Sequence, residues 1–88
     1  MNEIILTDNG KVVLAFMQSN DKVLIGKEIG EQTNIKGVYP VLTSLIRREL
    51  VVADEPIERP FVNNKGVETM KEYKTYKLTQ KGREFKIN

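Results

Sequence analysis

The length of the chain, 88 residues, is the feature that most constrains its fold. A chain this short buries only about 60–65% of the surface that it exposes when unfolded, so it can build one hydrophobic core. Its composition, 40% hydrophobic and 30% charged, is typical of a folded globular protein rather than of a disordered or fibrous one. We therefore expect one domain over residues 1–88 and exclude a multi-domain enzyme.

The chain contains no cysteine and no histidine. Disulfides, thiolate nucleophiles, the common zinc and haem sites and the Ser-His-Asp triad each need one of these residues. Asp54, Glu55 and Glu58 form an acidic cluster without a second set of ligands, so we interpret them as a solvated stretch of strand. One small core also leaves little room for a ligand pocket. We therefore predict no enzymatic activity, no cofactor or metal, and no small-molecule ligand.

The longest uninterrupted apolar run is Val12–Met17, six residues. A membrane span needs roughly 20 such residues, and the core of a signal peptide needs about 7 to 15. We therefore expect no membrane partner and a cytoplasmic location. The absence of cysteine fits a reducing compartment without requiring one.

The net charge of +2 is small, but its distribution is uneven. Residues 1–35 carry three cations and five anions, a net −2, so residues 36–88 carry +4. The positive charge lies in patches rather than in one basic tract, at Lys36, Arg47, Arg48, Lys74, Lys77, Lys81, Arg83 and Lys86. This pattern fits a nucleic-acid partner, but a solvated surface has the same composition.

Threonine residues mark the start of two expected helices. Thr7 precedes a helix over residues 8–19, and Thr79 precedes a short terminal helix over residues 80–85. Between them, residues 22–25 favour a short strand, and residues 26–32 favour a second helix because Ile25 and Ile29 lie four positions apart.

Pro40 restricts the start of a third helix. Proline is tolerated only in the first turn, so we expect the helix to begin at Val38 or Tyr39 and to run to Glu49. At about 100° per residue, one side is apolar and the other is polar. The apolar side carries Val38, Val41, Leu42, Leu45 and Ile46; the polar side carries Pro40, Thr43, Ser44 and Arg47, with Tyr39 and Arg48 at its margins. The hydroxyls and the guanidinium group suit base edges and phosphates, although they suit solvent equally.

A β-hairpin is expected after this helix. Residues 50–57 and 72–78 favour extended structure, and they are separated by Pro56, Pro60 and the turn Asn63–Gly66. Because proline has no N–H for a ladder, we expect the paired part to avoid Pro60 and the hairpin to have a long tip.

The order helix, strand, helix, helix, hairpin, helix is that of an α+β winged helix-turn-helix, in which the hairpin is the wing. Three stretches, Gly26–Ile29, Gly37–Leu45 with Leu50-Val51, and Lys74–Gly82, resemble the DNA-binding domain of the PadR-like transcriptional regulators. The Tyr76-Lys77-Leu78-Thr79 ending is shared more widely, including with MarR-like regulators. The resemblance spans residues 10–86 and implies repression of a promoter, with the third helix in the major groove and the wing on the adjacent backbone or minor groove.

The chain departs from this family at three places. Glu49 stands where the family usually has a glycine, so the helix is expected to end without a left-handed glycine or to run slightly longer. The wing, residues 56–72, is longer than usual and carries equal numbers of acids and bases. The long C-terminal helices through which such regulators dimerise have no counterpart before Asn88, which leaves the interface of a homodimer open.

Double-stranded DNA is the partner that these observations favour. We expect Lys27, Lys36 and Lys65 to contact phosphates, and Thr43, Ser44 and Arg47 to read bases. The further candidate contacts are Tyr39, Pro40, Arg48, Asn63 and Asn64, of which Tyr39 could equally pack against the core. A homodimer on a palindromic site is expected because one module binds DNA weakly.

A protein-interaction module is the alternative. The weak net charge and the mixed signs of the wing favour docking on the transcription machinery or on another regulator. In that case an exposed patch of Tyr39, Ile57 and Phe61 would be the centre of binding.

Overall fold

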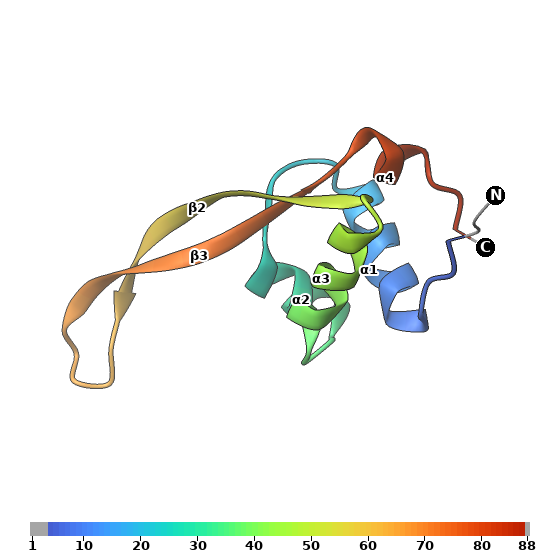
Figure 1. The fold of residues 1–88 in the computed structure, drawn as a ribbon. Coiled ribbons are helices and arrows are strands. Elements are labelled where there is room, and N and C mark those ends of the chain that lie inside the picture. Colours follow the sequence, from blue (N-terminus) through green and yellow to red (C-terminus); the bar gives the residue numbers. More distant parts are fainter. Residues whose placement is uncertain (1–3, 88) are drawn as a thin grey trace.

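The computed structural model describes residues 4–87. This part of the chain is an α+β domain with four helices and a three-stranded antiparallel sheet of order β1-β3-β2. The elements in chain order are α1 (Asp8–Ser19), β1 (Leu24–Ile25), α2 (Gly26–Thr33), α3 (Val38–Arg47), β2 (Val51–Val62), β3 (Glu68–Leu78) and α4 (Gln80–Glu84). Figure 1 shows the helices gathered into one body, from which the β2–β3 hairpin projects.

The two threonine caps are confirmed. The Thr7 hydroxyl accepts from the Gly10 N–H at 3.0 Å, and the Thr79 hydroxyl accepts from the Gly82 N–H at 3.0 Å. A Cβ added to Gly82 would overlap the carbonyl oxygen of Leu50. The glycine therefore allows the first turn of α4 to lie directly against the start of β2.

The hydrophobic core lies between α1, α2, α3 and the root of the sheet. Its side chains are Leu6, Val13, Leu14, Met17, Leu24, Ile29, Val38, Leu42, Leu45, Leu50, Val51, Tyr76 and Leu78. The predicted apolar side of α3 is confirmed, with Val38, Leu42 and Leu45 buried and Val41 and Ile46 partly buried. Burial of these side chains fixes which side of α3 remains exposed.

The third helix ends earlier than predicted. It stops at Arg47 rather than at Glu49, and Glu49 itself adopts a left-handed conformation with φ of 62°. The Glu49 N–H donates to the Ile46 carbonyl at 2.9 Å, which closes the last turn. The helix therefore ends without a left-handed glycine and does not run longer, and a glutamate takes the conformation that glycine usually provides.

The hairpin is paired over almost its whole length, which corrects the expectation of a long tip. The ladder runs from Val51 opposite Leu78 to Val62 opposite Glu68, with one irregularity between Asp54 and Ile57. Only residues 63–67 form the tip.

Pro60 lies within this ladder, opposite Met70. The Asn63 N–H donates to the Val67 carbonyl at 3.0 Å, and antiparallel ladders alternate between residues that face the partner strand and residues that face away. The backbone of Pro60 therefore faces away from β3. Because β2 is an edge strand, the missing N–H of proline costs no ladder hydrogen bond.

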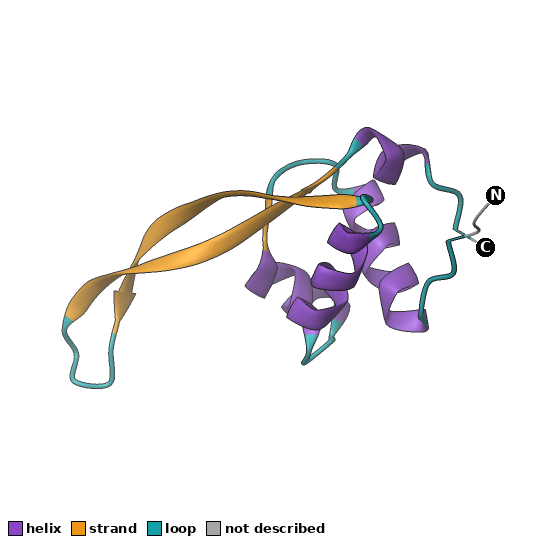
Figure 2. Ribbon diagram, viewed as in Figure 1, coloured by secondary structure: helices purple, strands orange, loops and turns teal. Residues whose placement is uncertain are grey.

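The arrangement is compatible with a winged-helix layout. Figure 2 shows the helices clustered at one end of the molecule and the strands extending from them. The hairpin makes the molecule elongated, with extents of 54 × 22 × 21 Å. Within residues 4–87, no helix has the length and apolar character that crossing a membrane requires.

Candidate nucleic-acid interface

The outer side of α3 carries five of the eleven predicted contacts. Tyr39, Pro40, Thr43 and Arg47 are exposed, whereas Ser44 is half-buried. This side lies opposite the core residues of the same helix, as the helical period requires. A molecule that binds along the outer side of α3 would therefore contact both the Thr43 hydroxyl and the Arg47 guanidinium group.

Arg48 is bound within the helix rather than free. Its Nη1 donates to the Ser44 hydroxyl at 2.7 Å and to the Ser44 carbonyl at 3.3 Å. The Ser44 hydroxyl keeps its own hydrogen for a further acceptor. The structure thus joins two of the predicted contacts into one unit, in which Arg48 orients Ser44.

The segment from Lys36 to Arg48 contains no carboxylate. Its thirteen residues hold three cations and no aspartate or glutamate. Lys27 and Lys36 are exposed, and they line one hollow of about 300 Å³ together with Tyr39. The start of α2 and the turn before α3 therefore present one cation each beside the first turn of α3, and Glu31 lines the same hollow.

Tyr39 packs against another ring while part of its side chain stays exposed. Its side chain is 44% exposed, yet its ring lies 6.5 Å from that of Tyr76. Burial raises the pKa of Tyr76, and the neighbouring Tyr39 raises it further. The contact connects the exposed side of α3 to the root of the hairpin.

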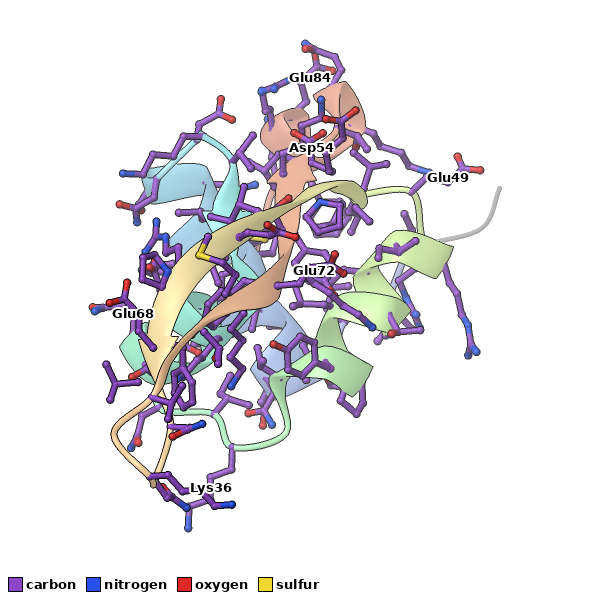
Figure 3. All side chains as sticks on the ribbon, turned by 90° about the vertical axis from the view of Figure 1, so that its left-hand side faces the viewer. Lys36, Glu49, Asp54, Glu68, Glu72 and Glu84 are labelled. Atoms are coloured by element: carbon purple, nitrogen blue, oxygen red, sulfur yellow. The ribbon has the colours of Figure 1, made fainter. Side chains whose placement is uncertain are left out.

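The three residues predicted to contact DNA from the tip of the hairpin, Asn63, Asn64 and Lys65, differ in their surroundings. The Asn63 Oδ1 atom accepts from the Lys65 and Val67 backbone N–H groups at 2.9 and 3.1 Å, so this oxygen holds the turn and is not free for a partner. Asn64 and Lys65 are exposed. Figure 3 shows the tip and Lys36 toward the same end of the view, and Figure 1 shows the tip well separated from the turn between α2 and α3 along the length of the hairpin.

Six residues that the sequence analysis did not assign to DNA lie on one face of the hairpin. Two of them are cations: Arg59 forms an ion pair with Glu28 at 3.2 Å, and Lys71 forms none within residues 4–87. The register places Arg59 opposite Lys71, Phe61 opposite Thr69 and Ile57 opposite Tyr73, all on one face of the hairpin. The Lys71 ammonium group lies 4.9 Å from the Phe61 ring and 5.6 Å from the Tyr73 ring. The period-2 alternation of β3 could have indicated this face, but only with the register known.

The opposite face of the hairpin is acidic. Glu58 lies directly opposite Glu72, and neither forms an ion pair within residues 4–87. Figure 3 shows Glu72 on the side of the hairpin toward α3. The equal numbers of acids and bases in residues 58–72 are therefore sorted onto two faces rather than mixed.

Several C-terminal cations that appeared as a basic patch in the sequence are paired with acids. Lys77 lies 3.9 Å from Asp54, Lys81 lies 4.0 Å from Glu49, and Arg83 lies 2.8 Å from Asp21. By contrast, Lys27, Lys36, Arg47 and Lys65 form no ion pair with the residues that the structure describes. The uncompensated cations therefore include those of α2, the α2–α3 turn, α3 and the hairpin tip.

The apolar patch considered for a protein partner is not continuous. Tyr39 contacts Tyr76, which pairs with Ala53, whereas Phe61 lies eight positions further along β2. At about 3.3 Å per residue, roughly 25 Å separates the two positions.

Comparisons of the chain with protein-family models, with curated proteins and with solved structures give no match.

Proposed function

We propose that the protein is a sequence-specific double-stranded DNA-binding protein and acts as a small transcriptional regulator of the winged-helix kind. In this proposal α3 enters the major groove, and the hairpin serves as the wing beside it. The resemblance to the PadR-like regulators supports this assignment, and the order of helices and strands is compatible with it.

One observation carries the proposal. The segment from Lys36 to Arg48 has three cations and no acid. Residues 73–83 also lack acids, but three of their four cations are paired with acids from other elements, whereas Lys36 and Arg47 form no ion pair within residues 4–87. A surface that approaches DNA must avoid carboxylates, because each one repels the phosphates and forfeits counterion release. The exposed side of α3 meets this requirement.

The residues divide into two roles. Arg47 and Thr43 project from the exposed side of α3 and read base edges, with Ser44 held by Arg48 beside them. Lys27, Lys36 and Lys65 contact phosphates and fix the position of the helix in the groove. Tyr39 and Pro40 lie in the first turn of α3, where the helix would approach the sugar-phosphate backbone of the DNA.

The proposal is tested by fluorescence anisotropy against random-sequence duplex over a range of salt concentrations, followed by selection of the bound fraction. We expect affinity to fall linearly on a log-log plot against salt, and a motif to be enriched. Arg47→Ala should then cost about 1–3 kcal/mol on the selected site and relax the preference at one base pair.

Arg83→Ala provides the matched control, because it removes the same charge from a residue that is paired with Asp21. Circular dichroism and thermal melting establish that both variants are folded. Equal effects of the two substitutions would overturn the assignment of α3 as the reading helix.

A protein-interaction module remains the second candidate function, and one observation favours it. Four large apolar side chains between residues 61 and 70 are exposed, namely Phe61, Val62, Val67 and Met70. Exposed apolar groups concentrated on one projecting element are typical of protein contacts. Absence of duplex binding even at low salt would favour this function over DNA binding.

A further inference from the structure

The outer edge of β3 is unpaired along most of its length. On this side, β1 pairs with only two residues of β3, Thr75 and Tyr76. Residues 68–74 pair with β2 on their other side, but on this side they have no neighbouring strand within the described chain. An unpaired strand edge presents a row of N–H and C=O groups that can pair with another chain.

The ladder shows which backbone groups face outward. Asn63 and Val67 face each other, as their hydrogen bond shows, so Thr69 and Lys71 face β2 and the even-numbered residues face away. The N–H and C=O groups of Glu68, Met70 and Glu72 therefore point out from β3, and within residues 4–87 they accept or donate no hydrogen bond outside the sheet.

The two edges of the hairpin differ in how they are protected. On the outer edge of β2, Pro60 has no N–H to offer, and proline is a common means of preventing strand addition. Residues 68–74 of β3 contain no proline. The hairpin is therefore blocked along one edge and open along the other.

We infer that the open edge of β3 binds a second copy of this chain, with the two β3 strands antiparallel about a two-fold axis at Lys71. Residues 69–73 of each copy form the ladder, with Met70 opposite Glu72 of the other copy. Such pairing is isologous, since the same edge is used on both sides.

Charge favours this arrangement. Glu68 lies at one end of the open edge and Lys74 at the other, so antiparallel pairing brings opposite charges together at both ends. At the axis, the Lys71 ammonium group is drawn toward the Phe61 and Tyr73 rings, which separates the two like charges. This inference does not depend on the proposed DNA binding, because the pairing needs no nucleic acid.

The absence of cysteine permits a direct test with Lys71→Cys, which introduces the only thiol. In the paired dimer the two introduced thiols lie in directly opposed positions, whose Cα atoms are about 4.5 Å apart and within reach of a disulfide. Oxidation by air with copper–phenanthroline should convert most of the protein to a disulfide-linked dimer. Arg59→Cys is the control, since Arg59 lies opposite Lys71 on the same face but on β2, which would be the outer strand of the paired dimer. Equal cross-linking of the two variants, or none, would overturn the inference.

A proline pair tests the hydrogen bonds themselves. Met70→Pro removes an outward N–H from β3, and Val62→Pro removes an outward N–H from β2; neither removes a bond between β2 and β3. Sedimentation equilibrium should show dimerisation weakened at least tenfold by Met70→Pro and unchanged by Val62→Pro. If the two variants dimerise equally, or the unaltered protein is monomeric at high micromolar concentration, the inference is wrong.

Discussion

The helical body and the β2–β3 hairpin are held together by different forces. The body buries Leu14, Met17, Ile29 and Leu42 completely, whereas no residue between Glu58 and Glu72 is buried. Burial of apolar surface therefore stabilises the body, and backbone hydrogen bonds with cross-strand contacts stabilise the hairpin. A two-stranded ribbon of this kind is marginally stable alone, so the hairpin depends on its root in the helical body.

The largest expected effect comes from matched truncations in the two regions. Leu14→Ala should lower the free energy of unfolding by about 2–5 kcal/mol, because it leaves a cavity in the core. Met70→Ala should change it by less than about 0.5 kcal/mol, because this side chain is 59% exposed. Urea denaturation measures both. A similar loss for the two variants would show that the hairpin contributes to the core.

Glu49 lies where the body meets the hairpin, and its backbone is strained. A left-handed conformation costs a non-glycine residue roughly 1 kcal/mol. Glu49→Gly should therefore stabilise the protein by up to about 1 kcal/mol, even though it removes the 4.0 Å ion pair with Lys81, which is exposed and contributes little. Thermal unfolding provides the measurement, with Glu84→Gly as a control that should destabilise.

Deleting the distal part of the hairpin tests directly whether the helical body folds and binds DNA without it. Replacement of residues 58–72 by Asn-Gly joins Ile57 to Tyr73, which already lie opposite each other, through a turn that suits two-residue hairpins. The free energy of unfolding should change by less than about 1 kcal/mol. Dimerisation through β3 should be lost, and DNA binding through α3 should be weakened but retained. Unfolding of this variant would show that the body depends on the hairpin.

The smallest effect concerns Tyr76 at the hairpin root. Burial, with a further contribution from Tyr39, raises the pKa of the Tyr76 phenol above its ordinary value of 10.0. The native state therefore holds this proton more tightly than the unfolded state, so stability is retained below pH 10 and falls as the pH rises through the native pKa. Tyr76→Phe should reduce this alkaline loss. Denaturation at pH 9 and pH 11 tests it, and an unchanged pH dependence would contradict it.

The sequence predicted the helical body well because its signals are local. The Thr7 and Thr79 caps, the apolar side of α3 and the position of Pro40 act within one or two turns of helix, and the structure agrees with each. The end of α3 was misplaced because Glu49 takes a left-handed conformation that its residue type does not favour. Thr79 bonds to the Glu49 carbonyl through its hydroxyl at 2.6 Å, a contact across thirty positions.

The hairpin shows what composition could not predict. From the sequence, residues 58–72 appeared as a neutral mixture of charges, and Pro60 appeared to interrupt the ladder. The register places Arg59 with Lys71 on one face and Glu58 with Glu72 on the other. A slip of one residue would reverse both faces, and nothing within either strand alone specifies the register.

The sequence by itself therefore determined the number and order of the helices, their caps and the side of α3 that is exposed. Only the tertiary structure decided which cations are neutralised, which face of the hairpin is basic and which strand edge is open. The physical reason is range: capping and helical periodicity depend on residues three or four positions apart, whereas ion pairs such as Arg83 with Asp21 and the pairing of β2 with β3 depend on residues that only the folded chain brings together.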